Sequence, residues 1–113
     1  MSGKNKLMQA PPYDVETALR HLGANLRTAR LRRNLTIAEM AEKIGTGPRA
    51  VADAEKGKIT TGIGTYAALL WVVGLLDQLE AVADPEHDEE GQLLARFKER
   101  KRASKAGDLD NDF

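Results

Sequence analysis

The sequence contains no cysteine. This absence excludes a disulfide framework, a zinc site with thiolate ligands and a cysteine nucleophile, and it agrees with a reducing compartment. The two histidines, His21 and His87, are far apart in the chain and do not indicate a metal site. The carboxylates of residues 77–90 have no partner base or nucleophile beside them in the sequence. We therefore predict that the protein is not an enzyme and binds no metal or cofactor.

Long apolar runs are also missing. The opening segment MSGKNKLMQAPPY lacks the apolar core of a signal peptide, and the longest apolar run, residues 67–76, is too short to span a bilayer. We expect no membrane role and a cytoplasmic location. With 113 residues, the chain has room for one domain and its flanking tails.

A phosphate-binding loop is the third absence, although residues 45–58, GTGPRAVADAEKGK, are rich in glycine. A P-loop needs Ser or Thr after its Gly-Lys pair and a glycine five residues before that pair, but Ile59 and Ala52 occupy these positions. A dinucleotide fingerprint needs a strand before its glycines, whereas the residues before Gly45 have the pattern of a helix end. We interpret the stretch as a turn between two helices.

Apolar spacing and capping residues predict five helices within residues 14–84. Asp14 is the expected N-cap of the first helix. Thr36, with Glu39 three residues later, matches a capping box that opens the second helix, and Gly45 is the expected end of that helix.

The third helix is expected to begin at Pro48 and to end at Gly57. An almost wholly apolar fourth helix follows over residues 66–73, and a fifth, more polar helix ends before Pro85. So much apolar surface exceeds what one core face needs, which favours a subunit interface on the last two helices.

The net charge is zero, but the charges are separated along the chain. Residues 20–58 carry nine Lys or Arg against four Asp or Glu, residues 77–90 carry seven acids and no Lys or Arg, and residues 96–105 carry six bases and one acid. The pattern predicts a basic domain followed by a charge-striped tail, although each block alone also suits a solvated helix face.

Three residues have the spacing of a steep helix crossing: Ala41 is small, Gly45 tolerates a left-handed backbone and Val51 can anchor the next helix. The run LGANLRTARLRRNLTIAEMAEKIGTGPRAVADAEKGK, residues 22–58, resembles the helix-turn-helix of the phage-repressor and Cro-like (XRE) family. The resemblance implies an all-α, five-helix phage-repressor-like domain that binds double-stranded DNA. The segments GTYAALLWVVGL and ADPEHDEEGQLLAR are similar to antitoxins of the HipB type, which are encoded beside a HipA-like kinase toxin.

In this family the third helix enters the major groove, and the matching base-facing residues here are Pro48, Arg49, Ala52 and Asp53. Arg49 can bond O6 and N7 of guanine, but it also suits a phosphate contact or a solvated arginine. Asp53 can accept a hydrogen bond from cytosine or orient Arg49. Ile37 replaces the glutamine of relatives that read bases from the second helix, which leaves readout from that helix in doubt.

The resemblance also implies contacts outside the base-reading helix. The candidates for contacts to DNA phosphates are Arg27, Thr36, Lys43, Lys56 and Lys58. For each lysine, a solvated surface position is an equal alternative. Arg30 and Glu55 match an ion pair that ties the first helix to the third. A homodimer that binds a palindromic operator is expected, and its predicted interface consists of Tyr66, Leu70, Trp71, Val73, Leu76 and Leu79. Tyr66 and Trp71 also suit a place in the core.

Two functions of different classes follow. The first is a transcriptional repressor, a HipB-like antitoxin that autoregulates its operon and binds a HipA-like kinase toxin. The alternative is a protein-interaction module that neutralises a partner and binds DNA only secondarily, and an XRE regulator without a toxin also fits the sequence.

The tails complete the predicted organisation. Residues 1–13 are predicted to be disordered, residues 14–84 to form the DNA-binding and dimerisation domain, and residues 85–113 to be a flexible charged tail with a short helix at residues 93–102. One face of that helix would carry Leu93, Leu94 and Phe97 and is expected to bind a protein partner. The competing interpretation is that the block RFKERKRASK adds contacts to DNA phosphates.

Overall fold

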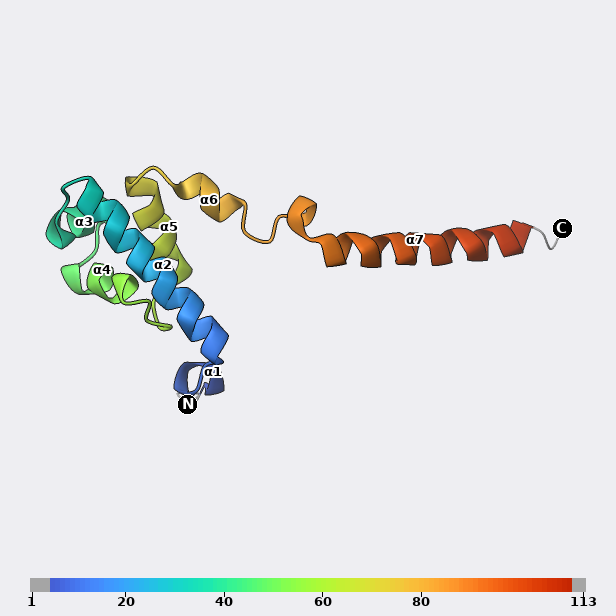
Figure 1. The fold of residues 1–113 in the computed structure, drawn as a ribbon, viewed down its shortest axis with the longest axis horizontal. Helices are drawn as coiled ribbons and strands as arrows, with labels where there is room; N and C mark the ends of the chain where they lie inside the picture. The colour runs from blue at the N-terminus through green and yellow to red at the C-terminus, as the bar shows by residue number, and fades with distance from the viewer. Residues whose placement is uncertain (1–4, 111–113) are drawn as a thin grey trace. The chain divides into compact units, whose positions relative to one another are not determined.

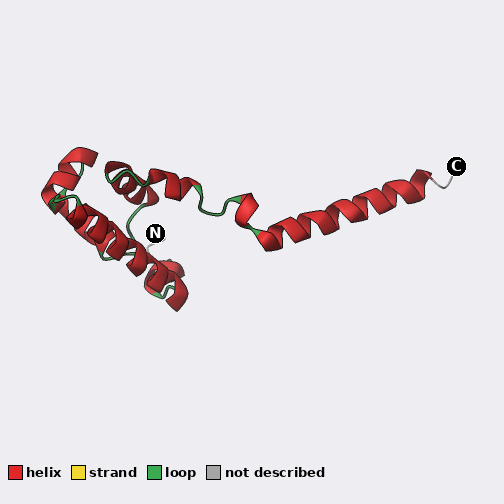
Figure 2. Cartoon of the chain, turned by 45° about the horizontal axis from the view of Figure 1, so that its top comes forward, coloured by secondary structure: helices red, strands yellow, loops and turns green. Residues whose placement is uncertain are grey.

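The computed structural model describes the backbone of residues 5–110 and the side chains of residues 5–106. Seven α-helices and one short 3₁₀ helix occupy this part of the chain, without a strand (Figure 2). The predicted all-α fold class is confirmed. The chain divides into two compact units, residues 1–79 and 80–113, and each is described by itself (Figure 1). No helix of residues 5–110 has both the length and the apolar character needed to cross a membrane.

The first unit is built from α-helices packed around α4. Its elements are α1 (Lys6–Gln9), α2 (Tyr13–Arg32), α3 (Ile37–Ile44), α4 (Pro48–Glu55) and α5 (Ile63–Val72), and α6 (Leu76–Glu80) crosses its boundary. The long α2 packs against α4, α3 packs against α4, and α5 packs against both α3 and α4 (Figure 1).

The N-terminal segment differs from the prediction of a disordered tail over residues 1–13. Residues 6–9 form α1, and the side chain of Asn5 caps this helix by accepting a hydrogen bond from the Leu7 amide at 2.9 Å. Pro12, not Asp14, is the N-cap of α2. Asp14 lies in the first turn instead, where its carboxylate faces the positive end of the helix dipole. Residues 1–4 lie outside the described part of the chain.

The caps of α3 and α4 are those predicted from the sequence. The Thr36 hydroxyl accepts a hydrogen bond from the Glu39 amide at 3.0 Å, and the Glu39 carboxylate accepts one from the Thr36 amide at 3.0 Å. Gly45 ends α3 in the left-handed region, with a φ of 74°. Gly47 is the N-cap of α4, whose first residue is Pro48. The turn between the two helices is therefore short and sharply defined.

One apolar core holds the first unit together. Its buried residues are Leu26, Ala29, Met40, Ala41, Val51, Ala54, Tyr66, Leu69, Leu70 and Val73. Ala41 and Val51, which the sequence placed at the helix crossing, are 2% and 0% exposed. The small Ala41 lets α3 and α4 approach each other, and Val51 anchors α4 in the core.

Two glycines set the distance between α2 and the end of α4. A Cβ atom on Gly23 would lie 2.5 Å from the carbonyl oxygen of Glu55 and 2.6 Å from that of Ala54. A Cβ atom on Gly57 would collide with the backbone of Leu19, and the φ of Gly57 is 71°. Backbone atoms cannot rotate away as a side chain can, so a larger residue at either position would push the two helices apart.

The second unit contains more helix than the predicted flexible tail. Its elements are the 3₁₀ helix η1 (Pro85–His87) and α7 (Glu89–Asp110). Asp88 starts α7 by accepting a hydrogen bond from the Gly91 amide at 3.0 Å, and the Gln92 side chain donates to the Pro85 carbonyl at 2.9 Å. The helix is 22 residues long, so the short helix expected at residues 93–102 extends in both directions. Residues 111–113 lie outside the described part of the chain.

Candidate nucleic-acid interface

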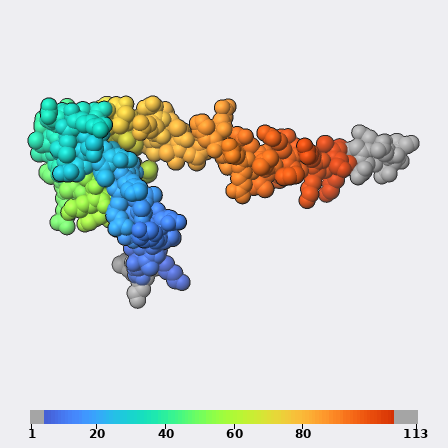
Figure 3. All heavy atoms as spheres, in the orientation of Figure 1, coloured from blue at the N-terminus to red at the C-terminus, as the bar shows by residue number. Residues whose placement is uncertain are grey.

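Helix α4 has one buried side and one exposed side. Val51 and Ala54 have no exposed surface and attach the helix to the core. The other side carries Arg49, Ala52 and Asp53, and the C-cap residue Lys56 continues their i, i+3, i+4, i+7 spacing. Arg49 and Lys56 are exposed, while Ala52 and Asp53 are partly exposed. The green spheres of this part of the chain form part of the surface of the first unit in Figure 3.

The predicted base-facing residues differ in how free their side chains are. Pro48 and Arg49 are exposed in the first turn of α4. Asp53 forms an ion pair with Lys58, with 3.3 Å between Oδ1 and Nζ. Within residues 5–106 no ion pair joins Asp53 to Arg49, so the structure does not place Asp53 as the residue that orients this arginine.

The predicted phosphate contacts all lie at the surface of the first unit. They are Arg27 on α2, Thr36 and Lys43 at the two ends of α3, and Lys56 and Lys58 after α4. The hydroxyl of Thr36 is engaged in the capping box. A phosphate at this end of α3 would therefore meet the backbone amides of the first turn and the positive end of the helix dipole.

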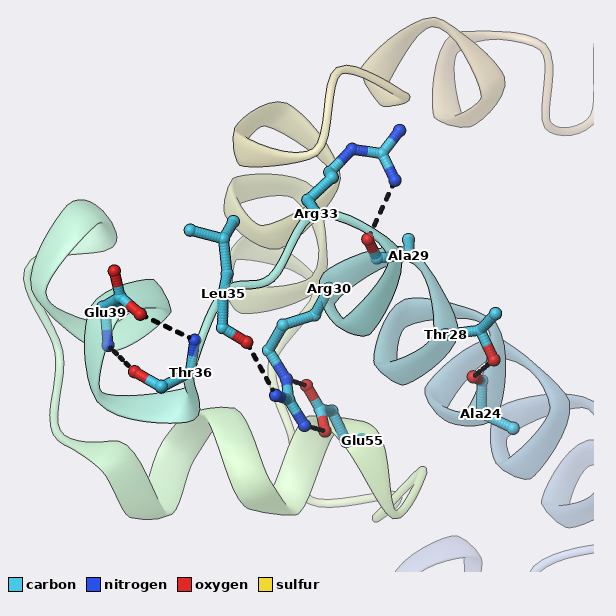
Figure 4. A network of polar contacts seen from close by, with 9 residues as sticks. All are labelled: Ala24, Thr28, Ala29, Arg30, Arg33, Leu35, Thr36, Glu39 and Glu55. Carbon is cyan, nitrogen blue, oxygen red and sulfur yellow. Dashed lines mark hydrogen bonds and ion pairs between the residues drawn. The ribbon is translucent and has the colours of Figure 1, made fainter.

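Arg30 connects three parts of the motif (Figure 4). Its Nε and Nη2 atoms donate to the two carboxylate oxygens of Glu55 at 2.6 and 2.9 Å, and its Nη1 donates to the Leu35 carbonyl at 2.9 Å. The side chains of Arg30 and Glu55 are only 8% and 6% exposed. The hydrogen bond to Glu55 raises the pKa of Arg30, and burial opposes this shift. The predicted ion pair is confirmed, and it ties α2 to the end of α4 and to the loop before α3.

The predicted dimer interface requires a correction. Tyr66, Leu70 and Val73 are 3%, 7% and 4% exposed in a single chain. Their side chains fill the core, because α5 packs against both α3 and α4. These three residues therefore have almost no surface left for a second subunit, and their assignment to an interface is wrong.

The remaining interface candidates are more accessible. Leu76 and Leu79 are partly buried against the core. Trp71 is 62% exposed and lies beside an open groove, which is also lined by Leu35, Lys43 and Val72. Trp71 is thus the interface candidate with the most surface available to a partner.

Three contributors to the motif were missed in the sequence. Gly23 permits the close approach of α2 to α4, and the sequence signal was a glycine within a helical pattern. Arg33 closes the end of α2 by donating to the Ala29 carbonyl at 2.8 Å (Figure 4). The Leu35 carbonyl, which accepts from Arg30, has no sequence signature at all. Ile37 packs against the core, which agrees with the departure from glutamine at this position.

Comparison with known families matches residues 21–83 to a model described as a helix-turn-helix domain, and this span is more than half of the chain. The chain belongs to the helix-turn-helix domain family. The matched residues contain α3, the turn and α4, and they support a DNA-binding regulator. In such a domain the second helix of the motif is the recognition helix, which here is α4. Comparisons with curated proteins and with solved structures gave no match.

Proposed function

We propose that this helix-turn-helix domain is a sequence-specific transcriptional repressor that binds double-stranded DNA with α4 in the major groove. The observation that carries the proposal is the division of α4 into two sides. Val51 and Ala54 are fully buried, whereas Arg49 and Lys56 are exposed on the other side. The major groove admits an α-helix, and a helix anchored on one side can present the other to base edges.

The ion pair of Arg30 supports this function because it holds the recognition helix in place. It fixes the last residue of α4, Glu55, and the loop that precedes α3. Contacts to base edges depend on geometry, and side chains on a rigid helix hold that geometry better than side chains on a loop. The pair itself is buried and needs no contact with DNA.

Arg49 is the proposed base-reading residue. Its guanidinium can donate to O6 and N7 of one guanine at the same time, which no other exposed side chain in the first turn of α4 can do. Ala52 offers an apolar contact, as to a thymine methyl group. Asp53 holds the ammonium group of Lys58 beside the recognition helix, where a phosphate contact of Lys58 would compete with this ion pair.

We further propose that the repressor is a C2 homodimer with an interface around Trp71. Trp71 is exposed beside the open groove that Leu35, Lys43 and Val72 also line, so its ring has surface available to a second subunit. Two recognition helices about one DNA turn apart, roughly 34 Å, would read a palindromic operator. Sedimentation of the protein as a stable monomer at micromolar concentration would contradict this arrangement.

The finer proposal is a HipB-like antitoxin that autoregulates its operon, binds a HipA-like kinase toxin and has no catalytic activity of its own. It rests on the sequence resemblance and on the exposure of Leu93 (52%), Leu94 (61%) and Phe97 (59%) at the start of α7. An apolar face on a helix suits a groove of a protein partner. We expect a kinase-like reading frame beside the gene. The wild type should bind the product of that reading frame, and the variant Leu94→Ser/Phe97→Ser should lose this binding. Normal DNA binding without such a partner would leave a stand-alone regulator.

The experiment that tests the proposed function is selection of duplexes from a random pool by the full-length protein. We expect a palindromic consensus with guanine at one position of each half-site, as Arg49 requires. Enrichment of no consensus, at a salt concentration where the protein still binds DNA, would show that the domain does not read sequence.

A further inference from the structure

The basic residues in the second half of α7 include a stripe along one side of the helix. Lys98, Lys101, Arg102 and Lys105 stand at positions i, i+3, i+4 and i+7, the spacing of neighbours on one helical face. All four side chains are exposed, and together with Ser104 they line one open depression. We call these four residues the basic stripe.

The described acids of α7 lie away from the basic stripe. No ion pair within residues 5–106 involves any of its four members. The acids of the first turn of α7, Glu89 and Glu90, precede the stripe by two turns, and Glu99 lies to one side of it. Four exposed positive charges on one face repel each other, so an anion with closely spaced charges would relieve that repulsion.

The charge per unit length of the basic stripe is similar to that of a nucleic-acid backbone. From Lys98 to Lys105 the helix rises about 10 Å, at about 1.5 Å per residue. Double-stranded DNA carries one negative charge per roughly 1.7 Å, so about six phosphates fall within the same length. The two linear charge densities are therefore of the same order and of opposite sign.

We propose that the basic stripe is a second DNA-binding site, which contacts phosphates without regard to sequence. The proposal rests on the proposed function of the first unit, because it assigns α7 to the same ligand as α4. It assigns the block RFKERKRASK to phosphate contact, which was one of the two sequence interpretations of the tail. The apolar face at Leu93, Leu94 and Phe97 precedes the stripe and stays available to a protein partner.

An anionic membrane is the other polyanion that a basic helix can meet, but the residue pattern favours DNA. A helix that lies on a membrane needs an apolar face along its length. The large apolar residues of α7 within the described side chains stop at Phe97, and residues 98–106 contain only alanines besides polar and charged residues. Within residues 98–106, the stripe thus has no large apolar side chain beside it that could enter a lipid surface.

Two double variants of the full-length protein form a matched test. Lys98→Gln/Arg102→Gln removes two charges from the basic stripe. Arg96→Gln/Arg100→Gln removes two charges at the same i, i+4 spacing from the opposite side of α7. Glutamine has a helix propensity close to that of lysine and arginine, and circular dichroism checks that helix content is unchanged.

The probe is a duplex of arbitrary sequence, about 25 base pairs long, titrated at salt concentrations from about 50 to 200 mM. We expect the slope of log affinity against log salt to become shallower by about 1.8 in the stripe variant, or about 0.9 for each lost phosphate contact. The slope of the control variant should differ from that of the wild type by less than about 0.45, which corresponds to half of one phosphate contact.

Each other outcome overturns the proposal in a recognisable way. Equal losses in both variants would mean that net charge acts, not the face. Wild-type slopes in both variants, or binding of the stripe only to vesicles of anionic phospholipid, would also refute it. Selection of a consensus sequence tests α4 separately from the stripe. If a consensus is selected but the salt slope of the stripe variant equals that of the wild type, the proposed function stands and the proposal for the stripe is refuted.

Discussion

The pair Arg30–Glu55 should be the most sensitive polar contact of the first unit. Each side chain is less than a tenth exposed, and one guanidinium satisfies both carboxylate oxygens and the Leu35 carbonyl. Removing either partner leaves a buried charge without its counter-ion, which costs roughly 3 to 5 kcal/mol. Domains have total stabilities of about 5 to 15 kcal/mol, so Glu55→Leu or Arg30→Met alone should leave the first unit marginally stable.

The double variant Arg30→Met/Glu55→Leu separates charge from packing. With both charges gone, nothing buried lacks a counter-ion, and replacing such a pair by apolar residues is often neutral or stabilising by about 1 to 4 kcal/mol. We therefore expect the double variant to be more stable than either single variant. The coupling free energy in the double-mutant cycle should be about 3 kcal/mol or more.

The assay is urea unfolding followed by the fluorescence of Trp71, the only tryptophan, which reports on the first unit and not on α7. Single variants that cost less than about 1 kcal/mol, with effects that add in the double variant, would refute the reasoning. Loss of DNA binding in the single variants is expected as well, because Glu55 ends the recognition helix.

Three further predictions concern packing, pH and phosphate contact. Gly23→Ala should destabilise the first unit by roughly 1 to 3 kcal/mol in urea unfolding, because its Cβ would meet two backbone carbonyls, whereas Gly64→Ala, with open space in α5, should be neutral or stabilising. Hydrogen bonds from the backbone and then the side chain of Thr36 lower the pKa of Glu39 below its ordinary 4.5. The ionised carboxylate thus stabilises the fold above pH 4.5, and this contribution is lost as the pH falls through the lower pKa of the folded state. The urea midpoint of Glu39→Gln should therefore fall less than that of the wild type between neutral and acidic pH. Lys56→Ala should weaken binding to all duplexes alike and reduce the salt slope by about 1 in a salt titration, and a change in base preference would contradict its assignment to phosphate.

The motif was predictable where local rules fix the backbone. The Thr36–Glu39 capping box, the left-handed Gly45 and Pro48 at the start of α4 each depend on residues within one turn. The Arg30–Glu55 pair came from resemblance to a family, since 25 residues separate its members and no periodicity links them.

The remaining features depend on tertiary packing. Helix α5 is apolar on nearly every side, so its sequence cannot tell which side chains fill the core and which face a partner. Leu70 was assigned to an interface, although it is buried in the core. The crossing at Gly23 depends on two carbonyls more than thirty residues away. The continuous helix α7 was not predicted, because exposed, highly charged helices and disordered tails have similar compositions.

The base preference of Arg49→Ala tests the central claim most directly. Affinities of the wild type and the variant are measured for every single-base change of the selected operator, with the symmetric change made in both half-sites. If α4 reads the major groove through Arg49, the variant loses its preference for guanine at one position per half-site, where discrimination falls by roughly 1 to 3 kcal/mol per contact, and keeps its preference elsewhere. An unchanged preference at every position, in a variant that folds and binds as tightly as the wild type, would contradict the account.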